Sequence, residues 1–577
     1  MRVDKASSTA LHNKTDNRSS KMKYRLSDLT IDTGRQLVSR ATDPIPLPKL
    51  SYDLLLVLVQ AAPNLVSQDE LMRLVWPGIV VSPETVSQRV KLLRDALDDD
   101  PRAPRYIAGL RGRGYQLAAA AEEVGEKSIA VLPFTDLSEK KDQEFFADGM
   151  AEEIIDFLVK IPRLKVISRT SSFQFKGAKQ DLRSIGTQLG VGYLLEGSVR
   201  RSDSRLRVTA QLIDCRDGMH LMSQTYERDI SDVLKVQDEI AATLVRALQI
   251  EVSADAGTAP RPASRSTEAY ASYLRGRHAH DRYDQQGFEQ AVDFYQRAPD
   301  LDPSFAAAAA ALAVAYSNLG IYGFMPPALA YEQARRAAEN AVALNPNLAP
   351  AHATLAMIIG MYYWDWPTAD REMKRALALA PNHAPNLLLA ARQSLAAGRW
   401  DDTLKLQNRS LEQDPLNPSS YLVRYYAQVR NGRLAEAEAA IRRTLEISPT
   451  FSSAHYYLGI VLLVRYQFEA ALAEMLKERD DATRLGGSAM AYFALGRQAD
   501  SDAALTQMLN SQADHHPFHI ALVYAFRGEA DEALKWLDRA YVQKDVRLLY
   551  IKGEPLLKNL DGNPRYEAFL QKMALPE

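Results

Sequence analysis

Apolar residues in the carboxy-terminal half of the chain recur with helical spacing, and the helical segments end at regularly spaced prolines. These prolines are Pro303, Pro346, Pro381, Pro415 and Pro449. Their successive spacings are 43, 35, 34 and 34 residues, which predicts pairs of antiparallel helices that repeat about every 34 residues. One repeat with about nine extra residues near Ile321–Leu329 accounts for the longer interval.

Other residues recur with the same period. A tight turn between two helices favours glycine, and a close helix crossing requires a small side chain. The turn glycines are Gly398, Gly432, Gly496 and Gly528, and the crossing positions hold Ala291, Ala334, Ala369, Thr403, Ala437, Ala471 and Ala533. Residues 268–577 are therefore predicted to be all-α, with a capping helix after a turn at Gly562–Pro564.

From Tyr270 to about Lys544, the pattern resembles a tetratricopeptide array of roughly eight repeats. The resemblance implies an all-α superhelix whose concave surface binds a protein or peptide partner. Aromatic residues in the repeats, such as Trp400 and Phe468, are expected to pack between helices.

Residues 24–118 follow a different pattern, in which short alternating segments precede helical ones. Tyr24–Ile31 and Gln36–Arg40 predict strands, and the apolar run Tyr52–Gln60 predicts a helix. A second helix is expected after Ser67, because Glu70 three residues later completes a capping box. A proline and a glycine end this helix.

The third predicted helix has Ser82 as its N-cap and Pro83 at its first position, a favoured arrangement. It ends at the acidic run Asp98–Asp100. Its apolar residues form one stripe, which we expect to be buried: Val86, Val90, Leu93 and Leu97.

A glycine-rich hairpin is predicted after the third helix. The short segments Tyr106–Ala108 and Tyr115–Leu117 flank the turn Gly109–Gly114. Residues 101–118 contain four arginines and no acidic residue, so the hairpin is locally basic.

This order of elements is typical of a winged helix-turn-helix. The segments ELMRLVWPG, ETVSQRVKLLRDAL and RYIAGLRGRGYQL resemble the OmpR/PhoB-type effector domain of response regulators. The resemblance implies that the Ser82–Leu97 helix enters the major groove of double-stranded DNA while the hairpin touches the minor groove or the backbone. Any role in phosphorelay signalling follows from this resemblance alone, since the sequence shows no receiver domain ahead of residue 24.

Polar residues on the third helix and the hairpin are the candidates for DNA contacts. Gln88 suits adenine and Arg89 suits guanine, whereas the other basic residues suit phosphates, which position the domain. Leu92 departs from the family pattern, which often has a polar or basic residue there. The predicted DNA-binding residues are Ser87, Gln88, Arg89, Lys91, Arg94, Arg111 and Arg113.

Residues 128–250 predict an α/β domain with a mixed sheet, because strand and helix patterns follow in the order β-α-β-α-β-β-β-α. A helix is expected to open at Asp148, with Glu152 and Glu153 as acids that offset the dipole at its N-terminus. The segments SIAVLPF, FADGMAEEI and YLLEGSVRR resemble the TolB-amino-terminal-like domain of CadC-like regulators. Similar domains also accompany some adenylate cyclases.

No paired catalytic motif stands out, so the sequence predicts no enzyme, no cofactor and no metal. Glycine-bearing segments lack the spacing of a phosphate-binding loop. Cys215 is expected to be a buried or strand-end thiol, and the cluster Asp514–His519 lacks a second pair of zinc ligands.

The formal net charge is −2, from 70 Lys plus Arg against 72 Asp plus Glu, and this near-neutral sum conceals the basic hairpin. Residues 1–23 predict a disordered basic tail rather than a signal peptide, and 251–267 predict a linker. A single cysteine fits a reducing compartment, and no apolar stretch predicts a membrane span. We therefore expect a cytoplasmic protein.

Together these patterns predict a sequence-specific, one-component transcriptional regulator with a repeat-based sensor region, which binds promoter DNA as a homodimer. The alternative is an interaction scaffold whose winged helix docks a protein instead of DNA. Steeply salt-dependent duplex binding would distinguish the first from the second.

Overall fold

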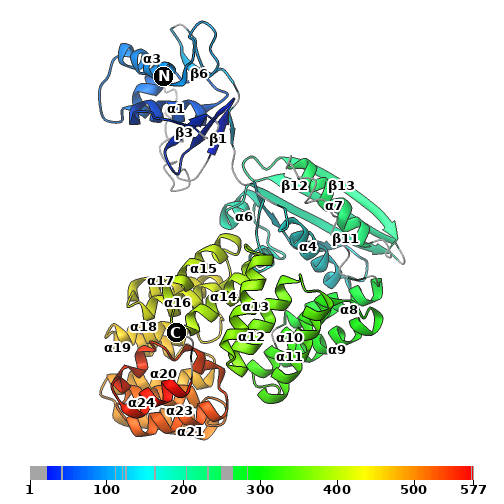
Figure 1. Cartoon of the computed structure of the whole chain (residues 1–577), viewed down its shortest axis with the longest axis vertical. Helices are drawn as coiled ribbons and strands as arrows, with labels where there is room; N and C mark the ends of the chain where they lie inside the picture. The colour runs from blue at the N-terminus through cyan, green and yellow to red at the C-terminus, as the bar shows by residue number, and fades with distance from the viewer. Residues whose placement is uncertain are drawn as a thin grey trace, which may run out of the picture. The chain divides into compact units, whose positions relative to one another are not determined.

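The computed structural model covers the chain of 577 residues and describes 23–40, 43–110, 112–119, 121–123, 127–161, 164–202, 205–229, 233–248, 264, 266–282, 284–573 and 575. The chain forms two compact units, Met1–Glu126 and Lys127–Glu577 (Figure 1). The predicted tail, apart from Lys23, and most of the predicted linker lie outside the described residues.

The first unit combines a twisted antiparallel sheet, a group of helices and a hairpin. Its elements are β1 (Lys23–Leu26), β2 (Leu29–Asp32), β3 (Leu37–Arg40), β4 (Asp43–Ile45), α1 (Lys49–Ala61), α2 (Gln68–Val75), α3 (Pro83–Leu97), β5 (Ile107–Leu110), β6 (Gly114–Leu117) and β7 (Ala121–Glu123). The sheet has the order β4-β3-β2-β1-β7, and β5 pairs only with β6 in the described part of this unit.

The sequence signals for the helices of this unit are confirmed, and one strand prediction is corrected. Ser67 and Glu70 form the capping box at the start of α2. The single strand predicted over Tyr24–Ile31 is instead the hairpin β1–β2, because Ser27 adopts a left-handed φ of 56° and reverses the chain. Leucines of β1 and β2 pack with the buried faces of α1 and α3 in one core.

The second unit begins with a mixed α/β domain. Its elements are β8 (Lys127–Val131), β9 (Thr135–Asp136), α4 (Glu144–Leu158), β10 (Leu164–Val166), α5 (Arg169–Ser172), η2 (Phe173–Phe175), α6 (Leu182–Leu189), β11 (Tyr193–Ser202), β12 (Arg205–Asp214), β13 (His220–Asp229) and α7 (Val233–Ala247). The strand order is β10-β8-β11-β12-β13, with β8 parallel to β10 and β11 and the later pairs antiparallel. Cys215 directly follows β12, and burial raises the pKa of its thiol to about 11.

The predicted start of α4 is wrong. The helix begins at Glu144, so Asp148, Glu152 and Glu153 lie in its second and third turns instead of at its N-terminus, where an acid would offset the dipole. The side chains of Asp148 and Glu152 are buried and pair with cations from other elements.

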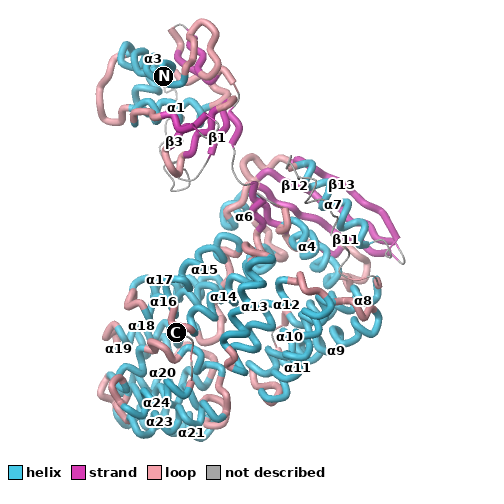
Figure 2. The backbone as a smooth tube through the Cα atoms, in the orientation of Figure 1, coloured by secondary structure: helices cyan, strands magenta, loops and turns pink. Residues whose placement is uncertain are grey.

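The remainder of the second unit is an array of antiparallel helix pairs joined by loops, and its described residues form no strand (Figure 2). The helices are α8 (Thr267–His280), α9 (Gln285–Leu301), α10 (Ala306–Ile321), α11 (Pro327–Leu344), α12 (Ala349–Ile358), η5 (Ile359–Tyr363), α13 (Trp366–Leu379), α14 (Ala384–Ala396), α15 (Trp400–Gln413), α16 (Pro418–Arg430), α17 (Leu434–Ile447), α18 (Ala454–Val464), α19 (Phe468–Met475), α20 (Asp481–Ala494), α21 (Gln498–Gln512), α22 (Pro517–Phe526), α23 (Ala530–Val542), η6 (Val546–Tyr550), η7 (Pro555–Leu560) and α24 (Pro564–Lys572).

The turn glycines and small residues that recur with the 34-residue period lie at turns and helix crossings of this array. Gly398 and Gly432 adopt φ of 79° and 70° at the turns within their pairs. The small residues at the predicted crossing positions, including Thr403, are fully buried. None of the helices in the described segments combines the length and the apolar composition that crossing a bilayer requires.

Two side chains of the predicted cluster Asp514–His519 contact α23 or η6. Asp514 pairs with Arg539 at 2.5 Å, and Arg547 Nη1 lies 3.0 Å from His516 Nδ1. Over the residues described, no group of three or more His, Cys, Asp or Glu side chains is placed to hold a metal ion.

The segment after α23 returns along earlier repeats. Lys544 Nζ donates to the Tyr362 carbonyl at 3.2 Å, and Lys552 Nζ donates to the Ala397 carbonyl at 3.4 Å. Cations at helix carboxyl ends interact favourably with the helix dipole. Buried Arg430, at the end of α16, pairs with Glu554 at 2.9 Å. The segment thus crosses the carboxyl ends of η5, α14 and α16.

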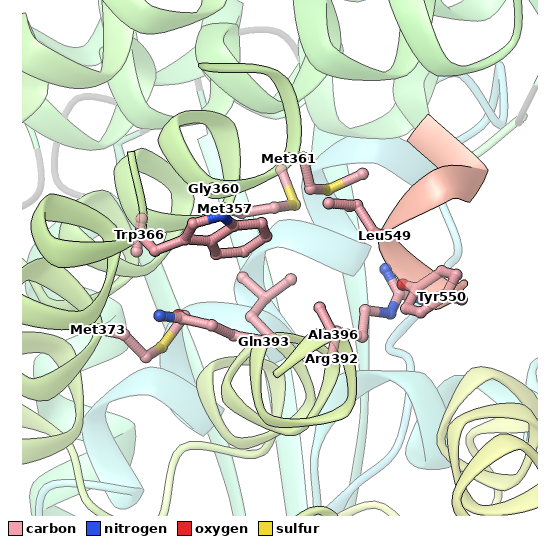
Figure 3. Close-up of a pocket in the computed structure, with 12 residues that line it drawn as sticks. Met357, Gly360, Met361, Trp366, Met373, Arg392, Gln393, Ala396, Leu549 and Tyr550 are labelled. Atoms are coloured by element: carbon pink, nitrogen blue, oxygen red, sulfur yellow. The ribbon is translucent and has the colours of Figure 1, made fainter. Parts of the chain in front are cut away.

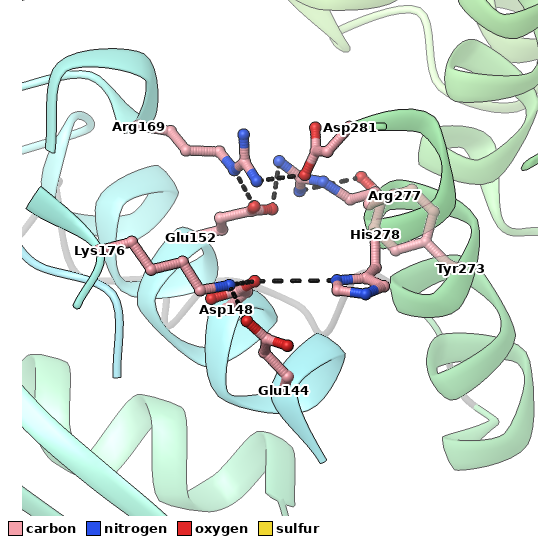
Figure 4. Close-up of polar contacts among 9 residues, drawn as sticks. All are labelled: Glu144, Asp148, Glu152, Arg169, Lys176, Tyr273, Arg277, His278 and Asp281. Carbon is pink, nitrogen blue, oxygen red and sulfur yellow. Dashed lines mark hydrogen bonds and ion pairs between the residues drawn. The ribbon is translucent and has the colours of Figure 1, made fainter. Parts of the chain in front are cut away.

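An ion-pair network joins the α/β domain to the first repeat. Glu152 on α4 pairs with Arg169 and with Arg277 on α8, and Arg169 also pairs with Asp281 (Figure 4). Gly149 permits the close approach of α4 to α8, since a Cβ there would lie 2.4 Å from a methyl of Leu274.

A second polar group joins the domain to a later repeat. Ser171 Oγ donates to Asp414 Oδ1 at 2.5 Å, and the Leu416 amide donates to Ser171 Oγ at 2.8 Å. Because both side chains are buried, these hydrogen bonds fix the orientation in which the α/β domain packs on the repeats.

Replacing Glu152 by alanine is expected to destabilise the second unit. The change leaves Arg169 and Arg277 without their shared buried carboxylate, which costs about 3–5 kcal/mol for a buried pair. Urea unfolding of the full chain measures the loss. The control is Glu239→Ala, which breaks the exposed pair with Arg228 and costs at most about 1 kcal/mol. Equal losses in the two variants would contradict a docking role for Glu152.

The pKa of His278 on α8 is expected to lie above 6.5, because its Nδ1 lies 3.9 Å from Asp148 Oδ2 on α4 and the carboxylate favours the protonated imidazole. Glu144 also raises this pKa, whereas partial burial of the ring and Lys176 oppose the rise. The stabilising contribution is therefore present below pH 6.5 and is lost as the pH rises through the raised pKa. An NMR titration of His278 in the parent and in Asp148→Asn tests this, and the variant should return the pKa toward its ordinary value. A parent pKa at or below 6.5 would refute the contact.

Candidate nucleic-acid interface

The orientation of α3 follows from its buried stripe. Val86, Val90, Leu93 and Leu97 are fully buried, as predicted. A helix that buries one stripe presents its opposite face to solvent. That face carries exposed Ser87, Gln88 and Lys91, with Arg89 half-buried at its border.

The β5–β6 hairpin is held beside α3 by a backbone bridge to the segment between α1 and α2. The Tyr115 amide donates to the Val66 carbonyl at 2.9 Å, and the Val66 amide donates back at the same distance. Gly114 permits this contact, because a Cβ there would lie 2.1 Å from the Val66 oxygen and its φ is +139°. The Tyr115 hydroxyl then reaches Ser87 Oγ at 3.3 Å, so the hairpin touches the exposed face of α3.

A buried carboxylate fixes the end of α3 against the start of β5. Asp99 accepts hydrogen bonds from the backbone amides of Arg105, Tyr106 and Ile107 at 2.6, 3.1 and 3.0 Å. Arg94 lies alongside, with Nη2 donating to the Ile107 carbonyl at 2.8 Å and Nε 3.9 Å from Asp99.

Residues of the β1–β4 sheet also contact this junction between α3 and β5. The Tyr106 hydroxyl donates to Asp28 Oδ1 at 2.5 Å, and this hydrogen bond lowers the pKa of Asp28. Arg40 joins Asp28 at 3.2 Å and donates to the Leu97 carbonyl at 2.6 Å. These contacts hold the β1–β4 sheet against the carboxyl end of α3.

The predicted DNA-contacting residues separate into three groups. Ser87, Gln88, Lys91 and Arg113 are exposed on α3 or the hairpin turn, and Arg89 is half-buried beside them. Arg94 is instead directed into the junction with β5, where only 15% of its side chain is exposed. Arg111 lies outside the described residues.

Sequence reasoning missed the residues that position this surface. The sequence indicates Asp99 only as part of the acidic run that ends α3, because its role as an acceptor for backbone amides has no local signature. Leu92, noted as a departure from the family pattern, has 47% of its surface exposed on α3.

Comparison with known proteins places this surface in a family. Residues 42–117 match the family model "Transcriptional regulatory protein, C terminal". The transcriptional regulator HilA of Salmonella typhimurium is 23% identical over 418 residues, which cover 70% of this chain and 73% of HilA. The transcriptional activator CadC of Escherichia coli is 34% identical over 101 residues, which cover 17% of this chain and 20% of CadC.

An enzyme-named protein is also similar. The putative adenylate cyclase 3 of Rhizobium meliloti is 42% identical over 190 residues, which cover 32% of this chain and 32% of that protein. The chain therefore spans about a third of this relative.

Substitution of the hairpin glycines is expected to separate backbone strain from steric clash. Gly112→Ala places a side chain at φ +74° in open space and costs about 1–2 kcal/mol for the left-handed conformation. Gly114→Ala should cost more, because its Cβ also meets the Val66 carbonyl. Amide hydrogen exchange in α1 and α3 of the full chain measures the loss of stability in each variant. A smaller loss for Gly114→Ala than for Gly112→Ala would contradict the bridge.

The family model covers α1, α2, α3, β5 and β6, the elements that build the exposed polar surface, and it confirms the predicted winged helix-turn-helix. Residues 42–117 therefore match an OmpR/PhoB-type transcriptional regulatory domain, and the chain that carries them is similar in sequence to the HilA and CadC transcriptional regulators.

Proposed function

We propose that the protein is a one-component transcriptional regulator that binds promoter DNA through α3 and the β5–β6 hairpin. The observation that carries the proposal is the exposed polar face of α3, held beside the hairpin within a segment of a transcriptional regulatory family. The sequence similarity to HilA over 70% of this chain supports the same function for more than the domain alone.

We assign the contacts by the chemistry of each side chain. Gln88 and Arg89 read base edges in the major groove, because their amide and guanidinium groups match adenine and guanine. Lys91 and Arg113 contact phosphates, as we also propose for Arg111. Arg94 positions the surface and does not contact DNA, because its Nη2 donates to the Ile107 carbonyl and only 15% of its side chain is exposed.

The second unit is proposed to be a sensor, in which the TolB-amino-terminal-like α/β domain and the tetratricopeptide array respond to a partner or ligand. A homodimer on tandem half-sites and a cytoplasmic location, where the chromosome is accessible, complete the proposal. We propose no enzymatic activity. The family matched is a regulatory one, and the cyclase relative is matched over only 32% of its length.

Arg89→Ala and Arg113→Ala are expected to weaken DNA binding in different ways. Arg89→Ala should lower affinity for a selected operator by about 1–3 kcal/mol and relax base preference at one position, because it removes a base-edge contact. Arg113→Ala should weaken binding to all sequences and reduce the slope of log affinity against log salt by about 1. Fluorescence anisotropy of the full chain with operator and scrambled duplexes measures both.

Arg35→Ala is the matched control, since Arg35 is exposed at the turn between β2 and β3 and outside the proposed interface. Its affinity and salt slope should equal those of the parent. Equal affinity of the parent, Arg89→Ala and Arg113→Ala for the operator would refute DNA recognition by this surface. If the affinity for duplex DNA did not change with salt concentration, the result would instead favour the alternative in which the winged helix docks a protein.

A further inference from the structure

The cavity between the middle repeats and η6 is nearly filled by the chain's own apolar side chains. Trp366 of α13 and Leu549 of η6 lie on opposite sides of it, and it encloses about 30 Å³ (Figure 3). That volume holds one or two water molecules. Leu92 on α3 has much less cover, because 47% of its surface is exposed.

Leu92 is the one large apolar side chain that α3 exposes, and the structure describes every residue of this helix. The buried stripe of α3 packs in the core of the first unit, and Leu92 is not part of that core. Packing of the domain therefore depends little on a leucine at this position.

Leu92 lies on the face of α3 that is proposed to read bases. Successive residues of an α-helix are about 100° apart around its axis, so Leu92 lies about 40° from Gln88, one turn earlier. The Tyr115 hydroxyl, 3.3 Å from Ser87 Oγ, places the hairpin on one flank of this face. Leu92 lies on the other side of Gln88, away from the hairpin.

Two more exposed residues that carry a methyl group lie on the same side of α3 as Leu92. Thr85 is two turns before Leu92, and Ala96 is one turn after it. All three residues are exposed. They form a strip of methyl groups beside Gln88.

The chemistry of the major groove decides what such a strip can contact. Base edges there present hydrogen-bond donors and acceptors, and the C5 methyl group of thymine is the apolar group among them. Leucine forms no hydrogen bond with a base edge or a phosphate through its side chain. Covering it with another apolar group removes both from water, which is favourable. A thymine methyl group is therefore the part of the groove that matches Leu92.

We propose that Leu92 contacts the C5 methyl group of a thymine in the major groove and makes that thymine a required base of the operator. The inference rests on the proposed DNA-reading function and adds an apolar contact to the polar ones of Gln88 and Arg89. One helical turn rises about 6 Å over four residues, and base pairs are about 3.4 Å apart. The thymine therefore lies within about two base pairs of the base that Gln88 contacts.

The test is a deoxyuridine scan of an operator selected with the full chain. Deoxyuridine pairs as thymine does and lacks only the C5 methyl group, so each duplex of the scan removes one methyl group. At one position the parent should lose about fourfold in affinity, as expected for one methyl group no longer removed from water. That position should lie within about two base pairs of the one where Gln88→Ala relaxes base preference. Fluorescence anisotropy measures the affinities.

Leu92→Ala should bind the thymine and deoxyuridine duplexes equally at that position, because the side chain that covers the methyl group is shortened. The variant should fold as the parent does, since alanine at an exposed helix position is favourable. Leu74→Ala is the matched control: Leu74 is 48% exposed on α2, outside the proposed interface, and its variant should keep the fourfold effect.

The outcomes separate this contact from DNA recognition as such. A selected operator that requires no thymine, or a deoxyuridine effect of equal size in the parent and in Leu92→Ala, would overturn the contact and leave DNA recognition standing. A parent that binds operator and scrambled duplexes equally would overturn the proposed function, and the contact with it.

Discussion

The buried carboxylate of Asp99 is the constraint on which the proposed DNA-binding surface depends. It accepts three backbone amides at the start of β5 and has Arg94 beside it, so the end of α3 and the base of the hairpin share one charged centre. A carboxylate withdrawn from water persists only when such donors surround it. The polar face of α3 and the hairpin turn thereby keep a fixed relation, as reading a groove requires.

The second unit is held together by the same principle on a larger scale. Glu152 is buried between cations of the α/β domain and of α8, and Asp414 accepts hydrogen bonds from Ser171. Paired buried charges tolerate little displacement, because separating them leaves an uncompensated charge. These contacts therefore fix how the α/β domain packs on the repeats. The segment that crosses the carboxyl ends of η5, α14 and α16 links the last helices to the same repeats.

The predicted start of α4 is wrong for an identifiable physical reason. Acidic residues are typical of a helix N-terminus, which predicts a start at Asp148, whereas the helix begins at Glu144 and Gln143, the residue before it, makes no side-chain cap. The prediction that Arg94 contacts a phosphate rests on its basic side chain and its place near the exposed face of α3. In the structure its guanidinium donates to the Ile107 carbonyl, which becomes a neighbour only when the hairpin folds back onto the helix.

The sequence by itself determined the features that depend on residues a few positions apart. These are the capping box of α2, the buried stripe of α3, the turn glycines and the period of the array. Only the tertiary structure decided which polar side chains meet. Tyr106 and Asp28 are 78 residues apart, and Ser171 and Asp414 are 243 apart. The pairing of such groups depends on how whole elements pack, and local periodicity carries no information about it.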